Sequence, residues 1–250
     1  MILKRVKNLV RKLFHSFGYY IANLNGISYL EVLMYGYLQN KKKIFFIQIG
    51  ANDGVSTDPI YNFVTLNSSI VEGFALEPMP DVFEALKKNY KRYSNVRLCN
   101  LAIHNSKSEM DLYKVNPKFS KDLPKWTKGI ASFNKKHHEL SGIDSKFIIS
   151  EKVKCISFDM LIEKYNIKHV DLLQIDTEGY DSEIIFSIDF SKIKPSIIHF
   201  EHGLRDGVMD KHTFLKVKSL LHANGYGIIV ELYDVIAYQE DLLVNKTLFE

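Results

Sequence analysis

The ten residues FFIQIGANDG, from Phe45 to Gly54, decide how this sequence is interpreted. An apolar run, typical of a buried strand, stops at two glycines that enclose Asn52 and Asp53. Glycine lets a backbone turn tightly and approach a ligand closely, and free N–H groups before a helix favour a negatively charged ligand group. The spacing is not the dinucleotide motif G-x-G-x-x-G. The stretch predicts a strand, a ligand-binding turn and a helix, the first unit of an α/β domain.

Composition sets the broad class of the protein. The 250 residues are 46% hydrophobic and 25% charged, which is ordinary for a globular protein with a substantial core. The net charge of +4 is mild, and no Lys/Arg stripe with interleaved aromatics argues for a nucleic-acid partner. Cys99 and Cys155 lie in apolar or alternating runs without zinc-ligand spacing. We expect buried, reduced thiols and a cytoplasmic protein.

The N-terminus has a pattern of its own. In MILKRVKNLVRKLFHSFGYY, residues 1–20, apolar residues recur at helical spacing and basic residues occupy the other positions. Such a helix can lie on an anionic membrane surface, which would make the protein peripheral at the inner membrane, or it can pack on the domain. No apolar run is long enough to span a membrane, and no signal-peptide cleavage site follows.

From Ile44 onward, strand-like and helix-like segments alternate, which predicts βαβ units and a mainly parallel sheet. We expect an N-terminal helical extension over residues 1–40 and one domain over residues 41–250. Residues 115–150 are irregular and contain Trp126 and the pair His137–His138. Because a long loop in a compact domain is usually functional, this insertion is predicted to form a lid or to bind a polar substrate, with Ser132 and Asn134 as contacts.

An acidic residue follows the next predicted strand. In FALEP, Glu77 lies about twenty residues beyond the glycine turn, where a carboxylate can accept hydrogen bonds from both hydroxyls of a ribose. The glycine turn and Glu77, in this order on consecutive strands, predict a ligand that contains a nucleoside.

Five segments then resemble, in order, the FkbM family of S-adenosylmethionine-dependent methyltransferases: FIQIGANDG, GFALEPMPDVFEALKKN, NVRLCNLAI, DLLQIDTEGYDSEII and IIHFEH. The resemblance extends from about Ile44 to Glu201. It implies a class I methyltransferase fold, Rossmann-like, whose mainly parallel seven-stranded sheet is flanked by helices. It also implies S-adenosylmethionine as cofactor, bound by Gln48, Gly50, Ala51, Asn52, Asp53, Gly54, Glu77, Pro78, Asn100 and Ala102.

By this resemblance, the glycine turn wraps the methionine portion of the cofactor, Glu77 binds the ribose, and residues 100–103 border the adenine. Two positions depart from the family pattern. Gln48 stands where the family often has Asp, and Gln174 stands where a Lys is common. Gln48 offers no negative charge to the cofactor, and Asp53 is the nearby residue that can.

Candidate catalytic residues follow two later strands. Asp176 and Glu178 come after one strand, and Glu201 and His202 come at the end of the next, whose His199 we expect in the core. Because neighbouring parallel strands end at the same edge, these side chains are predicted to share a cleft. Asp176 or His202 would act as a general base, or the four would hold a divalent cation such as Mg²⁺. Alternatively, the two glutamates only cap helices or pair with lysines.

Members of the FkbM family mostly methylate oxygen, so the resemblance implies O-methylation of a sugar hydroxyl in a cell-surface glycan or a related metabolite. Three alternatives remain open. The first is a catalytically silent accessory module, which would explain Gln48. The second is an NAD-dependent oxidoreductase, although the third glycine of its motif is missing. The third is a nucleic-acid methyltransferase, although the Asn-Pro-Pro-Tyr-type tetrapeptide usual in amino-directed DNA enzymes is missing after the fourth strand. The sequence leaves the oligomeric state undetermined.

Overall fold

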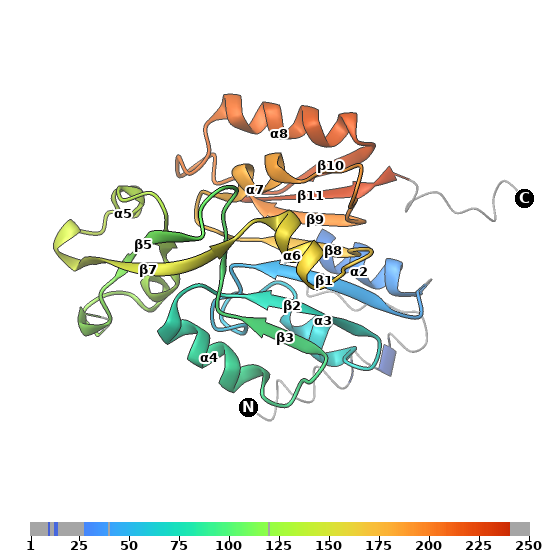
Figure 1. Ribbon diagram of the computed structural model, residues 1–250, viewed down its shortest axis with the longest axis horizontal. Coiled ribbons are helices and arrows are strands. Elements are labelled where there is room, and N and C mark those ends of the chain that lie inside the picture. The colour runs from blue at the N-terminus through green and yellow to red at the C-terminus, as the bar shows by residue number, and fades with distance from the viewer. Residues whose placement is uncertain (1–9, 11–12, 15–27, 40, 120, 241–250) are drawn as a thin grey trace, which may run out of the picture.

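The structure is a computed structural model that describes residues 10, 13–14, 28–39, 41–119 and 121–240. A seven-stranded sheet lies at its centre (Figure 1). From edge to edge the strands are β10 (Tyr226–Val230), β11 (Asp234–Gln239), β9 (Ile197–Glu201), β8 (Leu172–Ile175), β1 (Ile44–Ile49), β2 (Val71–Leu76) and β3 (Val96–Cys99). The strands from β9 to β3 are parallel, and β11 is antiparallel to both neighbours. The expected mainly parallel seven-stranded sheet is confirmed.

Apolar runs without alternation form the central strands because helices cover both faces of the sheet. One face packs on α2 (Tyr29–Gln39), α3 (Tyr61–Leu66) and α4 (Pro80–Tyr90). The other packs on α6 (Phe158–Lys164), α7 (Asp181–Ser187) and α8 (Lys211–Ala223) (Figure 1). Side chains alternate between these layers, so Phe46 and Leu172 contact the first set of helices and Ile47 and Leu173 the second.

Three of the described helices begin at residues that favour a helix N-terminus. Pro80 opens α4, with Asp81 in its first turn and Lys87 and Lys88 in its last, which suits the helix dipole. Ser157 caps α6, and Asp210 caps α8 by accepting hydrogen bonds from two backbone N–H groups of its first turn.

A smaller sheet carries the segment expected as an insertion. Its order is β4 (Ala102–Ile103), β7 (Ile148–Ile156), β5 (Glu109–Val115) and β6 (Ala131–Ser132). Strands β5 and β7 form an antiparallel arm that extends beyond the central sheet, at the left of Figure 1. Between them lie three 3-10 turns, η1 (Pro117–Phe119), η2 (Lys125–Gly129) and η3 (Ser145–Phe147), and the helix α5 (His137–Leu140). The segment from residue 116 to 147, here called the arm loop, is therefore built from short elements rather than irregular throughout.

Helix α2 belongs to the core of the domain. Leu30 and Met34 are buried against Phe46 of β1, and Tyr37 donates a 2.7 Å hydrogen bond to the buried carboxylate of Asp171. Most of the predicted basic helix of residues 1–20 lies outside the described residues, and the division at residue 40 stays a prediction. Among the helices that the structure describes, none is long and apolar enough to cross a membrane.

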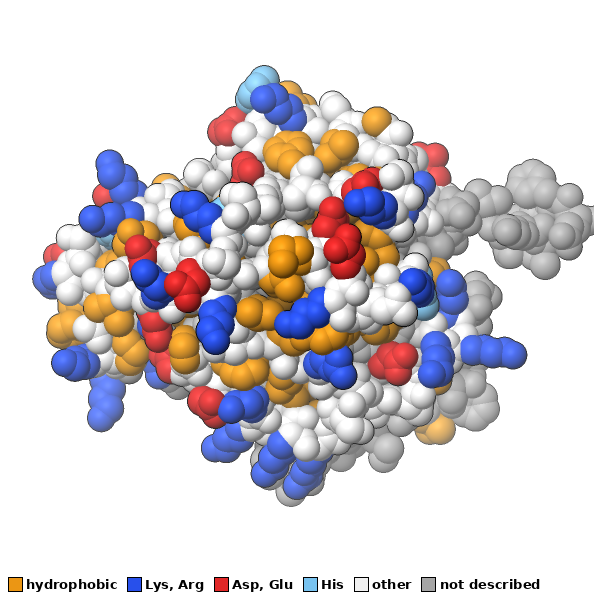
Figure 2. All heavy atoms as spheres, in the orientation of Figure 1, with side chains coloured by type: hydrophobic (Ala, Val, Ile, Leu, Met, Phe, Trp, Pro, Cys, Tyr) orange, Lys and Arg blue, Asp and Glu red, His pale blue; other side chains and the backbone are white. Residues whose placement is uncertain are grey.

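The described surface carries both signs of charge. On the face shown in Figure 2, Lys and Arg side chains are interspersed with acidic and hydrophobic ones. Cys99 and Cys155 are buried and form no disulfide, as expected for reduced thiols.

Candidate active site

The turn after β1 brings two loops of the sheet edge into close contact. Gly50, Asn52 and Gly54 have φ values of 81°, 49° and 71°, in the left-handed region that favours glycine and asparagine. A Cβ at Gly50 would overlap the backbone carbonyl of Asp176, and one at Gly54 would overlap side chains of α4. Gly50 is therefore required for the close approach of the two loops, and Gly54 for packing on the helix.

The N–H groups of this turn are used inside the protein, which differs from the expectation that they receive a negative ligand group. Gly50 and Ala51 both donate to the carbonyl of Leu76, and Gly54 donates to Ala51. The N–H of Asn52 donates to Glu77, and that of Asp53 donates to the Asn52 side chain. Helix α3 begins at Tyr61, several residues further on. The turn therefore shapes the wall of the site but offers a ligand none of the backbone N–H groups named above.

Glu77 connects the turn with the end of β2. Its two carboxylate oxygens each accept one backbone N–H, from Asn52 and from Met79, both at 2.9 Å. Burial raises the pKa of Glu77 to about 7, although these hydrogen bonds act in the opposite direction. Each oxygen keeps a further lone pair. Two ligand hydroxyls can therefore bind to this carboxylate.

A pocket of about 340 Å³ lies over this edge of the sheet, within the range of small-molecule sites. Of the ten residues predicted to bind the cofactor, five line it: Gly50, Asn52, Glu77, Pro78 and Ala102. The arm loop and β6 provide its outer wall, with Trp126, Ile130 and Phe133 among the lining residues. We call this the donor pocket. Apolar walls, one buried carboxylate and a close backbone turn fit an adenosyl group.

The other five predicted cofactor residues, Gln48, Ala51, Asp53, Gly54 and Asn100, do not line the donor pocket. Gln48 donates a 3.1 Å hydrogen bond to Asp58. Asn100 donates to the carbonyls of Glu77 and Pro78 and so shapes the loop after β2. Asp53 accepts hydrogen bonds from Val55 and Ser56, which lower its pKa although burial opposes them. Its charge stabilises its own turn.

A second pocket of about 360 Å³ adjoins the first, and Thr57, Asp176 and Glu178 line both. Its described lining holds five carboxylates and neither Lys nor Arg. We call it the acidic pocket; its carboxylates are Asp176, Glu178, Glu201, Glu231 and Asp234. Desolvation and the neighbouring carboxylates raise the pKa of Asp176 well above its ordinary value and that of Glu201 to about 8. Asp176 nevertheless remains open to the pockets that it lines.

Glu178 is the point where the arm loop meets the sheet. Its backbone is in the left-handed region, with φ 52°. The Ser132 hydroxyl donates a 2.7 Å hydrogen bond to its carbonyl, and Nε2 of His137 lies 2.9 Å from its Oε2. These contacts hold the arm loop over the junction of the two pockets.

Asp181 supports this junction and was missed as a site residue. It is buried and accepts hydrogen bonds from the backbone and hydroxyl of Thr177 and, at 3.3 Å, from the N–H of Glu201. Burial raises its pKa to about 6, against the effect of these hydrogen bonds. Asp181 thereby ties the loop after β8 to the end of β9. The motif DTEGYD contains it, but only the fold shows what it contacts.

The two histidines of β9 and its following loop are both buried, but only His199 lines one of the two pockets. His202 is 3% exposed and lines neither pocket. Its Nδ1 accepts the N–H of Leu204, and its Nε2 lies 3.2 Å from the carbonyl of Glu231. The prediction that His202 joins the acidic cleft is therefore not met. His199 is buried, as expected, but its side chain also lines the acidic pocket, where burial lowers its pKa to about 4.

Comparison with known proteins finds one matching family model and several solved structures of low sequence identity. The model of the methyltransferase FkbM domain matches residues 48–228. Solved structures include precorrin-6y C5,15-methyltransferase from Geobacter metallireducens (16% identity, 87% of this chain and 93% of that one, TM-score 0.40). SMU.1697c from Streptococcus mutans, in complex with SAH, is 8% identical (86% and 99% covered, TM-score 0.44). Human methyltransferase 10 domain containing protein is 11% identical (84% and 80% covered, TM-score 0.42). No curated protein matches significantly.

Proposed function

The chain belongs to the FkbM methyltransferase family and is an S-adenosylmethionine-dependent methyltransferase, and from this premise we propose that it methylates a hydroxyl of a sugar. The acceptor is a cell-surface glycan or a related metabolite that binds in the acidic pocket. This identification of the acceptor rests on the chemistry of that pocket and on the oxygen-methylating character of the family.

S-adenosylmethionine, when bound, supplies an electrophilic methyl group on a positively charged sulfur. The residues of the donor pocket suit it. Glu77 has a free lone pair on each oxygen for a ribose hydroxyl, and Ala102 and Ile130 provide apolar walls for the adenine. Gly50 contacts the backbone of Asp176 so closely that no side chain fits between the glycine turn and the loop that carries Asp176.

The observation that carries the proposal is the shared wall of the two pockets. Asp176 and Glu178 line both, so an acceptor in the acidic pocket meets the methyl donor beside these carboxylates. As the hydroxyl oxygen bonds to the methyl group, the sulfur–methyl bond would break with its electron pair on sulfur, leaving S-adenosylhomocysteine. Asp176 takes up the proton of the hydroxyl and so acts as general base. Glu178 and Glu201 accept hydrogen bonds from the remaining hydroxyls and orient the acceptor.

A sugar fits this pocket better than an apolar metabolite does. Five carboxylates give many acceptors for hydroxyl groups, and the partly exposed ring of Tyr233 offers an apolar surface for a sugar face. The basic amphipathic pattern of residues 1–20 favours an acceptor that is assembled at the inner membrane, with peripheral contact through this segment.

Calorimetric titration with S-adenosylhomocysteine, with NAD as the control ligand, is the first test. We expect binding in the micromolar range for S-adenosylhomocysteine and none for NAD. Sugar acceptors are then screened with S-adenosylmethionine by the release of S-adenosylhomocysteine. Cofactor binding with turnover on hydrophobic acceptors alone would refute the sugar assignment, and a folded protein that binds no cofactor would refute the methyltransferase activity of this chain.

A further inference from the structure

Three buried polar side chains form a row across the sheet on the face covered by α2 and α3. Gln48 of β1 is paired in register with Gln174 of β8, and Gln174 is paired with His199 of β9. Each carries a buried atom that has no hydrogen-bond partner among the residues that the structure describes: Gln48 Oε1, Gln174 Oε1 and His199 Nδ1. Buried polar atoms are nearly always paired, so such a row requires an explanation. Gln48 and Gln174 are also the two positions that depart from the family pattern.

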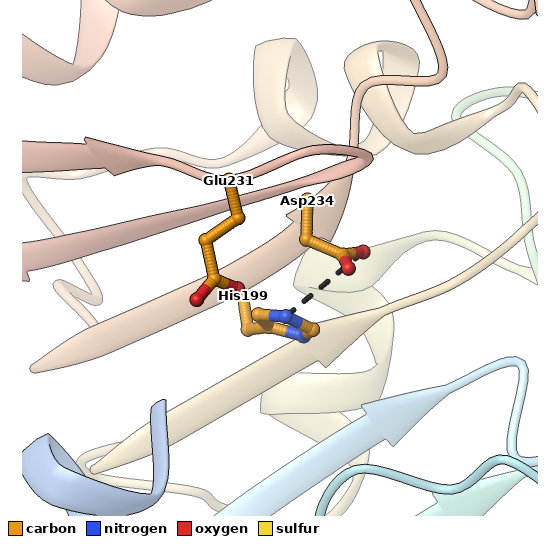
Figure 3. A group of neighbouring side chains, drawn as sticks. All are labelled: His199, Glu231 and Asp234. Atoms are coloured by element: carbon orange, nitrogen blue, oxygen red, sulfur yellow. Dashed lines mark ion pairs between the residues drawn. The ribbon is translucent and has the colours of Figure 1, made fainter. Parts of the chain in front are cut away.

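The row leads into the acidic pocket, which Gln174 and His199 both line. Their exposed fractions are only 2% and 6%, so both side chains are more than nine-tenths buried at the wall of this pocket. The turn between β10 and β11 brings Glu231 and Asp234 to the same place (Figure 3). A potential ligand atom of each of His199, Glu231 and Asp234 lies within 4.8 Å of the others.

We propose that His199, Glu231 and Asp234 bind a divalent transition-metal cation, with the side-chain oxygen of Gln174 as a further ligand. Imidazole nitrogen together with carboxylate oxygens suits Mn²⁺ or Zn²⁺, whereas Mg²⁺ prefers oxygen ligands throughout. This set shares no residue with the Mg²⁺ ligands expected from the sequence, namely Asp176, Glu178, Glu201 and His202.

The spacing of the side chains suits an ion better than a direct contact. Nε2 of His199 lies 4.0 Å from Oδ1 of Asp234, too far for a hydrogen bond (dashed line in Figure 3). Two ligands at about 2.1 Å from one metal ion are separated by roughly 3 to 4 Å. Glu231 is only half-buried, and its carboxylate already lies within 4.8 Å of the potential ligand atoms of the other two residues.

The charge of the pocket also favours a cation. No Lys or Arg stands among the described residues that line it, while five carboxylates do. Like charges at this separation repel one another, and a bound divalent cation removes that repulsion. The site lies in the wall of the acidic pocket away from the donor pocket, whose lining contains none of the three ligands.

The test uses the full chain without a histidine tag, stripped of metal by a chelator. Mn²⁺ is titrated into the protein, and the free ion is followed by its paramagnetic resonance signal. We expect one tight Mn²⁺ per chain, displaced by Zn²⁺. Glu231→Gln, in the turn after β10, and Asp234→Asn, at the start of β11, change half-buried residues and are expected to weaken binding at least tenfold. His199→Gln is expected to abolish it.

Glu72→Gln, Asp111→Asn and His212→Gln are matched controls at exposed positions and are expected to bind Mn²⁺ as the unaltered chain does. Titration of every sample with S-adenosylhomocysteine shows that it is folded. A chain that binds S-adenosylhomocysteine but neither Mn²⁺ nor Zn²⁺ overturns the metal site and leaves the proposed function standing. Unchanged Mn²⁺ affinity in both Glu231→Gln and Asp234→Asn overturns it as well.

Discussion

The backbone carbonyl of Asp176 lies directly against the α-carbon of Gly50, where a Cβ would overlap it. The N–H of Asp176 also donates a 2.9 Å hydrogen bond to the carbonyl of Ile49. The turn at the donor pocket and the loop that carries the proposed base are thus one rigid unit. Positions on this shared edge affect both the cofactor and the acceptor.

Gly50→Ala is expected to destabilise the protein by about 2 kcal/mol or more and to abolish binding of S-adenosylhomocysteine. The new Cβ overlaps a backbone oxygen, and a φ of 81° is strained for alanine. Thermal unfolding and calorimetry measure the two effects. Gly36→Ala is the matched control, because Gly36 lies in α2 with open space around it. That substitution should raise stability by about 0.5–1 kcal/mol and leave binding unchanged.

Cofactor affinity is expected to rise with pH between about 6 and 8 because of Glu77. Burial raises its pKa to about 7, so its carboxylate ionises over this range and becomes the stronger acceptor for ribose hydroxyls. Glu77→Gln should bind S-adenosylhomocysteine at least tenfold more weakly and should lose the part of the pH dependence that Glu77 causes. Calorimetry at several pH values measures both, and the same slope in both proteins would contradict the assignment.

The raised pKa of Glu77 also predicts how the stability of the fold depends on pH. Its pKa is higher in the folded chain than the ordinary value of 4.5, so the fold favours the protonated form. Without ligand, the contribution of Glu77 to the free energy of unfolding should therefore fall as the pH rises from about 4.5 to 7. Denaturant unfolding across this range measures the free energy of unfolding of the original chain and of Glu77→Gln. As the pH rises, the original chain should lose stability relative to the variant.

Asp176→Asn is expected to lower kcat by about 10²- to 10⁴-fold, because an amide of the same shape cannot take up the hydroxyl proton. Affinity for S-adenosylhomocysteine should stay within about threefold, since Gly50 contacts only the backbone of Asp176. Asp111→Asn, at an exposed position of β5, is the control for the chemical change. An Asp176→Asn enzyme with full turnover would rule out the role as base.

His137→Ala should release the arm loop from the junction of the pockets. Its Nε2 is 2.9 Å from Oε2 of Glu178, the side-chain contact between the two elements. We expect faster proteolysis within residues 116–147 and faster dissociation of S-adenosylhomocysteine, each by several-fold. Glu139→Ala changes an exposed residue of the same helix and should alter neither rate. Equal rates in the two variants would show that the contact does not hold the arm loop.

Much of the fold was predictable because its signals are local. The apolar run before Gly50 becomes β1, and the segment that starts at Pro80 becomes α4. The positions of Glu77 and Asp176 at strand ends followed from the same pattern. Glu77 was predicted to bind the cofactor and lines the donor pocket, whereas Asp176, predicted to lie in a catalytic cleft, lines both pockets. The roles of Asn100 and Asp53 were less predictable. Both were expected to bind the cofactor, but their hydrogen bonds stabilise loops of the protein.

The sequence by itself determined the mainly parallel α/β sheet and the edge at which the site lies, because hydrophobic periodicity and turn residues act over a few neighbouring positions. The family followed from the resemblance of five ordered segments. Only the tertiary structure decided which side chains share a pocket. His199 lies in the acidic pocket, and His202 is buried beside it, because the turn between β10 and β11 returns to the end of β9. That contact joins segments about thirty residues apart, and local periodicity fixes the face of a strand but not its distant neighbours.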